Sequence, residues 1–188
     1  MNFRALTLAA MLSVSAFSGA AVYAQDNPEV GGAAMFADKN IIENAVNSAD
    51  HTTLVAAVQA AGLVETLSGP GPFTVLAPVN AAFDALPAGT VENLLKPENK
   101  DMLSTILACH VIPAKALSTD IVSMVEEDGG EHVVDTVGGC KLTLKAADGK
   151  VTVTDENGTV ANVTIADVIQ SNGVIHVIDA VLTPKSAM

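Results

Sequence analysis

The stretch FTVLAPVNAAFDALP, residues 73–87, carries the clearest structural pattern in this 188-residue sequence. Residues 73–77 are a short run rich in aromatic and β-branched side chains, and Pro78 ends it, so we predict a strand there. Asn80 is a residue type that accepts hydrogen bonds from the free N–H groups at the start of a helix. We therefore predict that Asn80 caps a short helix, which places Phe83 in the core.

Helical patterns flank this stretch on both sides. Before it, apolar residues recur at helical spacing over residues 41–46 and 54–61, and Gly62 is placed to end the second helix. After it, Pro97 begins a segment whose apolar residues up to position 107 form one helical face. The sequence therefore predicts several helices in the first part of the chain.

After Pro113 the pattern changes from helical to extended. Short runs rich in Val and Thr cover residues 133–137, 140–145, 151–154 and 160–165. The dipeptides Asp148-Gly149 and Asn157-Gly158 between them favour turns with positive φ. We predict a β-meander here and, because the helices precede the strands, an α+β fold.

Two further segments complete the pattern. SNGVIHVIDAVLTP, residues 171–184, begins with a turn at Asn172-Gly173 and continues into an apolar strand that includes His176. Apolar residues occupy both faces of that strand, so we predict that both faces are covered. LACHVI, residues 107–112, joins the last predicted helix to the extended part of the chain.

Together these three segments resemble the fasciclin domain family, in the family's order and spacing. With residues 50–54, the resemblance covers about residues 40–185. It implies a wedge-like β core of about seven strands flanked by several α-helices. The structural motif residues that it implies are Phe73, Asn80, Phe83, Asn172, Gly173 and His176. It also implies an exported cell-adhesion or extracellular interaction module, not an enzyme and without a cofactor, that binds a protein or a matrix or cell-surface receptor.

The resemblance also implies interaction residues. Members of the family use a Tyr-His segment and an acidic-aliphatic motif before the Asn-Gly turn, and this chain has Cys109 at the Tyr position. The implied candidate interaction residues are Asp167, Val168, Ile169 and His110. The alternative for Asp167 is an exposed loop acid without a contact role. The resemblance implies a hydrogen bond from His110 toward the first signature, and a buried neutral His needs such a partner, for which Asn80 and Asp84 are candidates.

The N-terminus has the pattern of a secretory signal. Residues 1–24 combine one basic side chain, an apolar run and small residues at the end, so we predict cleavage before Gln25. Residues 25–39 lack periodicity and are interpreted as an N-terminal tether, and residues 186–188 as a tail. No later apolar run approaches the roughly 20 residues of a transmembrane helix. We expect a secreted, periplasmic or cell-surface protein with no transmembrane segment.

The charge and the aromatic content exclude some partners. The formal net charge is -12, and removal of the predicted signal makes it one unit more negative because Arg4 is lost. Nucleic acid and anionic membranes are therefore unfavourable partners, since contacts to phosphate supply most of the affinity there. After cleavage only Phe36, Phe73 and Phe83 remain as aromatics, so platforms for stacking bases are scarce.

The two cysteines leave two alternatives open. Cys109 and Cys140 both lie beyond the predicted cleavage site. In an oxidising compartment they can form one disulfide, or they can remain two buried thiols. The sequence does not supply the distance that decides between the two.

Motifs for catalysis or metal binding are missing from the sequence. The four histidines form no close ligand pair, and no nucleophile elbow or phosphate loop occurs. The acidic residues 126–128 are interpreted as a solvated turn rather than a calcium loop. A second functional hypothesis remains: a periplasmic small-ligand carrier with a pocket between the helices and the wedge, near Phe73, Phe83 and Leu107.

Overall fold

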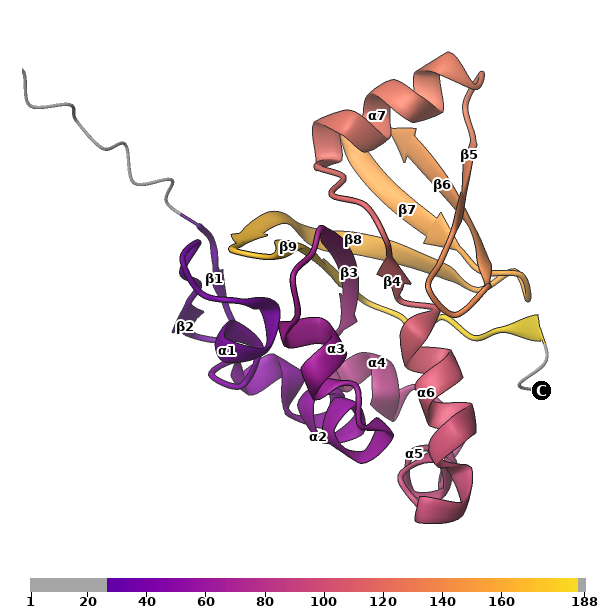
Figure 1. The fold of residues 1–188 in the computed structure, drawn as a ribbon. Coiled ribbons are helices and arrows are strands. Elements are labelled where there is room, and N and C mark those ends of the chain that lie inside the picture. Colours follow the sequence, from indigo (N-terminus) through magenta and orange to yellow (C-terminus); the bar gives the residue numbers. More distant parts are fainter. Residues whose placement is uncertain (1–26, 186–188) are drawn as a thin grey trace, which may run out of the picture.

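Seven strands form one sheet in the order β4-β3-β9-β8-β7-β6-β5 in the computed structural model, which describes residues 27–185 (Figure 1). The strands are β3 (Phe73–Pro78), β4 (Val111–Ile112), β5 (His132–Asp135), β6 (Lys141–Ala147), β7 (Lys150–Thr154), β8 (Val160–Gln170) and β9 (Gly173–Ile178). A separate hairpin consists of β1 (Glu29–Val30) and β2 (Ala33–Ala34). The predicted signal peptide and the tail lie outside the described residues.

Seven α-helices within these residues accompany the strands. They are α1 (Ile41–Ala45), α2 (Thr52–Ala61), α3 (Val64–Ser68), α4 (Asn80–Asp84), α5 (Thr90–Leu94), α6 (Lys100–Ala108) and α7 (Ser118–Glu127), with 3-10 turns at Ala49–His51 and Pro97–Asn99. The predicted α+β fold with a seven-stranded wedge and flanking helices is confirmed.

The sheet combines a meander with one parallel pair. Strands β5 to β9 pair antiparallel in chain order, as the glycine-containing turns predict. Strand β3 enters beside β9 and runs parallel to it, from Phe73 opposite Gly173 to Pro78 opposite Ile178. The two signature segments, which lie far apart in the sequence, are therefore neighbouring strands in the middle of the sheet.

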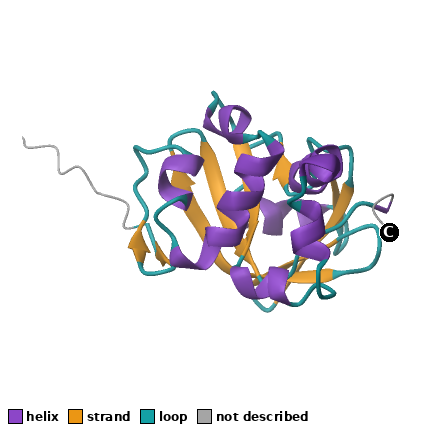
Figure 2. Ribbon diagram, turned by 90° about the horizontal axis from the view of Figure 1, so that it is seen from below, coloured by secondary structure: helices purple, strands orange, loops and turns teal. Residues whose placement is uncertain are grey.

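The central strands are covered on both faces, as we predicted for β9. Val75 on β3 and Ile175 on β9 belong to a core that they share with the helices from α1 to α6. Leu76 and Ile178, the alternate residues, belong to a second core beneath α7. Figure 2 shows the helices that share the first core lying across the strands. Full burial of each such side chain stabilises the fold by about 1.5–3 kcal/mol.

Helix α7 corrects our expectation that the chain is extended after Pro113. It spans Ser118–Glu127 and packs Ile121 and Val125 against the inner face of β6. The acidic residues that we interpreted as a solvated turn are the end of this helix and the residue that follows it. Helices therefore do not all precede the strands, because α7 lies between β4 and β5.

The segment before α1, which we interpreted as a tether, packs onto the domain over its described residues. Its hairpin β1–β2 is followed by Met35, and Val30 and Met35 are both buried in the core on the helical side. Asn27 forms two hydrogen bonds with the backbone of Ile169 on β8. The described part of the predicted tether thus packs onto the domain through both apolar and polar contacts.

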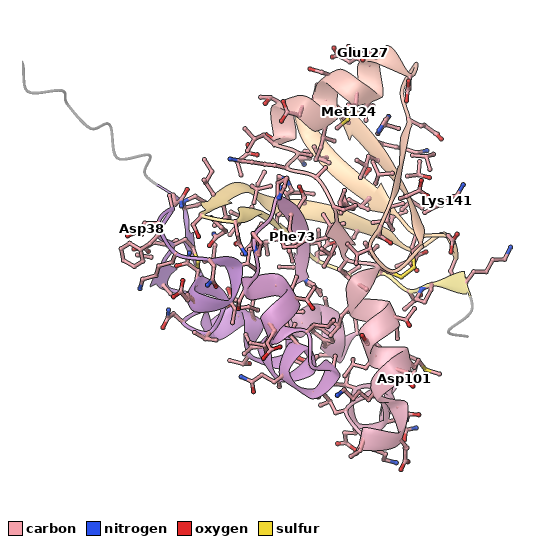
Figure 3. The ribbon with its side chains drawn as sticks, viewed as in Figure 1. Asp38, Phe73, Asp101, Met124, Glu127 and Lys141 are labelled. Atoms are coloured by element: carbon pink, nitrogen blue, oxygen red, sulfur yellow. A yellow bond between two sulfur atoms is a disulfide. The ribbon has the colours of Figure 1, made fainter. Side chains whose placement is uncertain are left out.

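The turn between β5 and β6 joins the two ends of the sheet. Val137 N donates to Val111 O on β4 at 2.8 Å, and Gly138 N donates to Ala108 O at 3.0 Å. Cys109 and Cys140 are joined there as a disulfide, with their Cα atoms 5.3 Å apart (Figure 3). A side chain at Gly138 would place its Cβ 2.8 Å from Cys109 N, so this close approach requires glycine.

We predict that this disulfide forms in the exported protein. Mass spectrometry after alkylation without reduction should find no modified cysteine, and two after reduction. Loss of the bridge in the double variant Cys109→Ser/Cys140→Ser should cost about 3 kcal/mol of unfolding free energy, because the unfolded chain regains the freedom of the closed loop. Two alkylated cysteines before reduction would contradict the prediction.

Candidate functional site

The signature residue Asn80 caps a different helix from the one we predicted. Its own helix, α4, has Val79 at the N-cap and no side-chain hydrogen bond there. The Asn80 Oδ1 atom instead accepts from Thr53 N at 3.0 Å and Thr52 Oγ1 at 3.2 Å, both at the start of α2. Its Nδ2 donates to Ala49 O at 2.8 Å. Asn80 therefore fixes α2 against the end of β3.

The second signature residue, Asn172, joins two other helices in the same way. Its Nδ2 donates to Leu67 O at 2.8 Å and Gly69 O at 3.0 Å at the end of α3. Its Oδ1 accepts from Ile41 N at 3.1 Å at the start of α1. Gly173 follows because a Cβ atom at that position would lie 2.1 Å from Phe73 O. The Asn-Gly turn thus holds both helices at the β3–β9 pair.

His110 lies inside the fold with both ring nitrogens occupied. Its Nδ1 donates to Ile106 O at 2.8 Å, and its Nε2 accepts from Leu182 N at 2.9 Å. Neither expected partner, Asn80 nor Asp84, bonds to the ring. Only the His110 backbone reaches the first signature, where its O accepts from Leu76 N at 2.8 Å.

The buried position also corrects the proposed contact role of His110. The residue is 2% exposed, so its ring cannot touch a partner in this fold. Burial lowers the pKa of His110 to about 4, against smaller opposing effects of the Ile106 backbone and the Asp155 charge. The ring is therefore a neutral link between the end of α6 and the chain after β9.

Asp167 occupies an irregular part of β8. The register between β8 and β9 shifts on the N-terminal side of Val168, and Asp167 has a φ of 59°. This φ favours glycine, although Asp and Asn adopt it more readily than most residues. The local bend turns the Asp167 carboxylate toward the start of α7.

The Asp167 carboxylate forms hydrogen bonds with the first residue of α7. It accepts from Ser118 N at 2.7 Å and also from the Ser118 hydroxyl. Asp167 N donates to His176 Nδ1 at 3.2 Å, and His176 Nε2 bonds to Ala116 O at 2.9 Å. Burial lowers the pKa of His176, opposed by the Ala116 backbone and the Asp167 charge. This network anchors α7, because it satisfies an N–H group that a helix start leaves free.

The two residues after Asp167 are not free for contact either. Val168 is 0% exposed and belongs to the core on the helical side. Ile169 is half-buried, and Asn27 takes its backbone hydrogen bonds. The expected interaction motif is thus corrected: Val168 cannot reach a partner, and Asp167 is engaged with α7.

Asp155 is a structural anchor that we did not predict from the sequence. Its Oδ1 accepts from Asn157 N at 2.9 Å and Thr159 N at 2.8 Å, which closes the turn between β7 and β8. Its Oδ2 accepts from Thr183 N at 2.8 Å, so the same carboxylate holds the segment after β9. An Asp two residues before Asn157-Gly158 was the available signal for the turn.

One face of four strands has no described helix over it. We name it the outer face: the side of β5 to β8 opposite α7. The pairing register places Val133, Thr143, Thr154 and Val160 in one row across these strands. Val133 is 55% and Val160 53% exposed. Lys141, labelled in Figure 3, is two residues from Thr143 on β6 and so lies on the same side. Alternation of polar and apolar residues over positions 141–145 of β6 was the sequence signal for this face.

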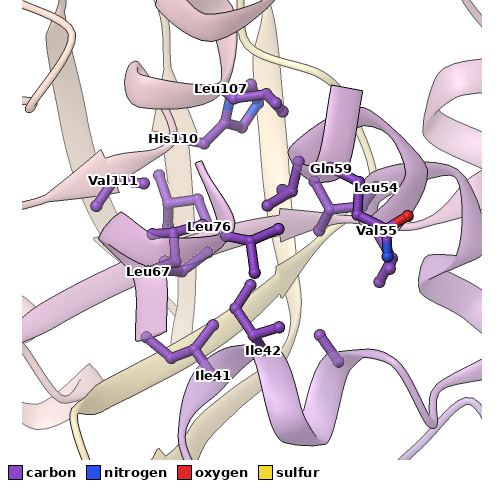
Figure 4. A pocket seen from close by; sticks show the side chains of 14 residues that line it. Ile41, Ile42, Leu54, Val55, Gln59, Leu67, Leu76, Leu107, His110 and Val111 are labelled. Carbon is purple, nitrogen blue, oxygen red and sulfur yellow. The ribbon is translucent and has the colours of Figure 1, made fainter. Parts of the chain in front are cut away.

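Two apolar hollows lie between the sheet and the helices, both lined by α1 and α2 and only the larger one also by α3. Their volumes are about 40 Å³ and about 30 Å³. Leu107, one of the residues expected around a pocket, lines the larger hollow, and Phe73 and Phe83 do not line either of them. The side chains around the larger hollow are shown in Figure 4.

The chemical groups of the described residues give no further site. Across positions 27–185 no group of three or more His, Cys, Asp or Glu residues is arranged to hold a metal ion. No helix in that range is long and apolar enough to cross a membrane. Our sequence-based expectations about metals and cofactors stay predictions.

Comparison with known proteins identifies the family. Residues 49–184 match the family model of the Fasciclin domain. The Synechocystis protein called Protein sll1483 is 54% identical over 144 residues, which cover 77% of this chain and 73% of that protein. The chain belongs to the fasciclin domain family, and its described residues form a single domain of that kind.

Two further relatives come from a bacterium and a mammal. Cell surface glycolipoprotein MPB83 of Mycobacterium bovis is 35% identical over 174 residues, covering 89% of this chain and 71% of that protein. Transforming growth factor-beta-induced protein ig-h3 of Sus scrofa is 40% identical over 133 residues, 71% of this chain but only 17% of that protein.

A solved structure shows the same fold. The FAS1 domain pair of the insect cell adhesion molecule Fasciclin I superposes with a TM-score of 0.70 at 17% identity. The superposition covers 79% of this chain and 52% of that pair, so the chain spans about half of it. The α+β wedge is therefore the fasciclin fold.

We predict that acid destabilises the fold through its buried histidines. The pKa of His110 falls from 6.5 to about 4 on folding, so the unfolded chain binds protons below pH 6.5 that the native chain excludes. Unfolding free energy should therefore fall as the pH drops from 6.5 toward 4, by about 3 kcal/mol for this group. Urea denaturation at a series of pH values measures the slope.

A His110→Gln variant is the control for this slope, because an amide can still donate and accept one hydrogen bond each. The variant should be less stable than the unchanged protein at pH 7.5. Between pH 6.5 and 5, where carboxylates contribute little to the pH dependence, its unfolding free energy should fall less steeply than that of the unchanged protein. Equal slopes in the two proteins would show that His110 does not cause the effect.

Proposed function

We propose that this chain is an exported, non-enzymatic interaction module that mediates cell adhesion by binding a protein, a matrix polymer or a cell-surface receptor. The observation that carries the proposal is the outer face, a sheet surface that no described element covers. Membership in the fasciclin family and the cell-surface name of the MPB83 relative support it. Retention in the periplasm or release to the surface both fit the proposed signal peptide.

The outer face has the physical properties of a contact surface. Its four strands present a continuous row of side chains, and Val133 and Val160 lie half exposed at the ends of that row. The ion pair between Lys145 Nζ and Glu131 Oε1, at 2.6 Å, balances charge at its edge. Lys141, Lys145 and Lys150 are exposed on this face of an acidic chain, so it repels an anionic partner less than the remaining surface does.

The signature residues do not compete for this role. The polar atoms of Asn80, Asn172 and His110 are hydrogen-bonded to helix ends and backbone groups. Substitution of these residues would therefore destabilise the fold and not test a contact with a partner. A surface module is most easily altered where side chains are exposed and bonded to nothing else. On this chain Val133 and Val160 meet that condition.

A cell-attachment assay tests the proposal. Cells of the source strain that lack the gene are applied to plates coated with purified domain, and soluble domain is the competitor. The variant Val133→Glu/Val160→Glu should reduce attachment at least tenfold, because it places a charge at each end of the apolar and polar row that we propose makes the contact. Circular dichroism checks that the fold is kept.

A matched control separates this face from general surface hydrophobicity. Val46→Glu/Met102→Glu changes two apolar residues of similar exposure on the helical side, and it should attach like the unchanged domain. Equal loss in both pairs would contradict a specific outer-face contact. Attachment that does not depend on the coated domain at all would contradict the adhesion proposal itself.

A further inference from the structure

We propose that the two hollows between the sheet and helices α1, α2 and α3 form one binding site for a short, uncharged, straight-chain molecule with a hydrogen-bonding group at one end, such as an aliphatic alcohol or ketone. This site is separate from the outer face, so the inference does not rest on the adhesion proposal. It gives the domain a second capacity, the uptake of a small amphiphile.

The walls of the larger hollow are almost entirely aliphatic. Its interior is formed by Ile41, Leu54, Val58, Leu67, Val75 and Leu107 (Figure 4). The His110 ring also lines it, but both nitrogens of that ring are already bonded. No aromatic side chain other than this ring, and no charged side chain, contributes to the wall. The wall therefore favours an alkyl chain over an aromatic or charged group.

The larger hollow is nearest the solvent at its helical rim. Ile42, Val55 and Val64 line it and are only partly buried, and Gln59 beside them is exposed. These residues come from α1, α2 and α3, which are short and separated by turns. A chain can therefore enter between these helices with less rearrangement than through the sheet.

The second hollow adds a polar group that has no partner. It shares the wall residues Ile41, Ala45, Leu54 and Val75 with the larger one, so the two are neighbours. The His51 ring lines it and is 3% exposed. Its Nδ1 bonds to Ser48 Oγ at 2.9 Å, and its Nε2 is buried without a hydrogen-bond partner.

The free Nε2 atom explains why the ligand should carry a hydrogen-bonding end. A buried polar atom without a partner costs about 1–3 kcal/mol, which a ligand that supplies the partner recovers. Burial lowers the pKa of His51, opposed by the Ala77 backbone and the Asp50 charge. By distance and angle, however, Nε2 has no hydrogen-bond partner. Because Ser48 Oγ can donate or accept, the neutral ring can offer either role to the ligand.

The volumes limit the length of the ligand. A water-sized group occupies roughly 10–15 Å³ on this scale, so about 40 Å³ and about 30 Å³ together hold about five or six non-hydrogen atoms. 1-Butanol and 1-pentanol have this size. Each added CH2 that still fits should strengthen binding about fourfold, and the gain should stop once both hollows are filled.

Titration with a series of 1-alkanols, from ethanol to 1-octanol, tests the proposal by two-dimensional NMR of the full mature chain. We expect saturable shifts in α1, α2 and α3 and in the His51 ring nitrogens, with an affinity that rises to 1-pentanol. If alkanols longer than 1-pentanol bind as tightly as 1-pentanol, their tails extend out through the helical rim. If they bind more weakly than 1-pentanol, the site is closed at that end. Either result supports the site, because both require that it is occupied.

Two variants with the same change in size locate the ligand. Ala45→Leu adds atoms to the wall that both hollows share and should weaken 1-pentanol binding at least tenfold, whereas Ala60→Leu adds them on the exposed side of α2 and should leave it unchanged.

A third variant tests the polar end of the site. His51→Phe should lower the preference for 1-butanol over 1-chlorobutane, which has the same number of non-hydrogen atoms.

Three results would overturn the proposal. One is the absence of saturable shifts up to the solubility limit of 1-pentanol, which would leave the hollows as packing defects or sites for water only. Another is equal binding by wild type and a folded Ala45→Leu variant. The third is binding without any change at the His51 nitrogens, which would remove the polar end from the site.

Discussion

The parallel pairing of β3 with β9 is the interaction on which the rest of the structure depends. It places the two signature segments side by side, with Phe73 opposite Gly173 and Pro78 opposite Ile178. Both strands are buried on both faces, so the helical core and the core beneath α7 are built on the same pair. The contact between Phe73 and Gly173 leaves no space for a side chain at position 173. A change here therefore affects both layers at once.

Polar side chains then attach the helices to this pair across long stretches of chain. Asn80 satisfies the start of α2, Asn172 joins the end of α3 to the start of α1, and Asp167 receives the start of α7. A free N–H or C=O group at a buried helix end is costly, so each of these bonds fixes where a helix lies. The residues that define the family's signatures therefore act on the fold. This leaves the outer face and the hollows as the places where this chain can meet other molecules.

The sequence predicted those features whose signal is local. The strand at residues 73–77, the meander after residue 133 and the helices on either side follow from periodicity and turn residues within a few positions. Helix α7 was missed, although Ser118, Ile121 and Val125 have helical spacing, because its acidic C-terminal end resembles a turn. The hydrogen-bond partners of Asn80 and His110 were predicted incorrectly because they are set by tertiary packing. The burial of Val168 was missed for the same reason, since its neighbours come from distant segments.

Native-state hydrogen exchange measures the central claim most directly. If β3 and β9 support both cores, the protected amides of residues 74–77 and 174–177 should exchange only through global unfolding, with a free energy equal to that from denaturation. Amides of β6 and β7, which border the outer face and one core, should exchange no more slowly than those of β3 and β9. The account would be contradicted if the β3 and β9 amides exchanged through local opening while those of β6 and β7 stayed protected.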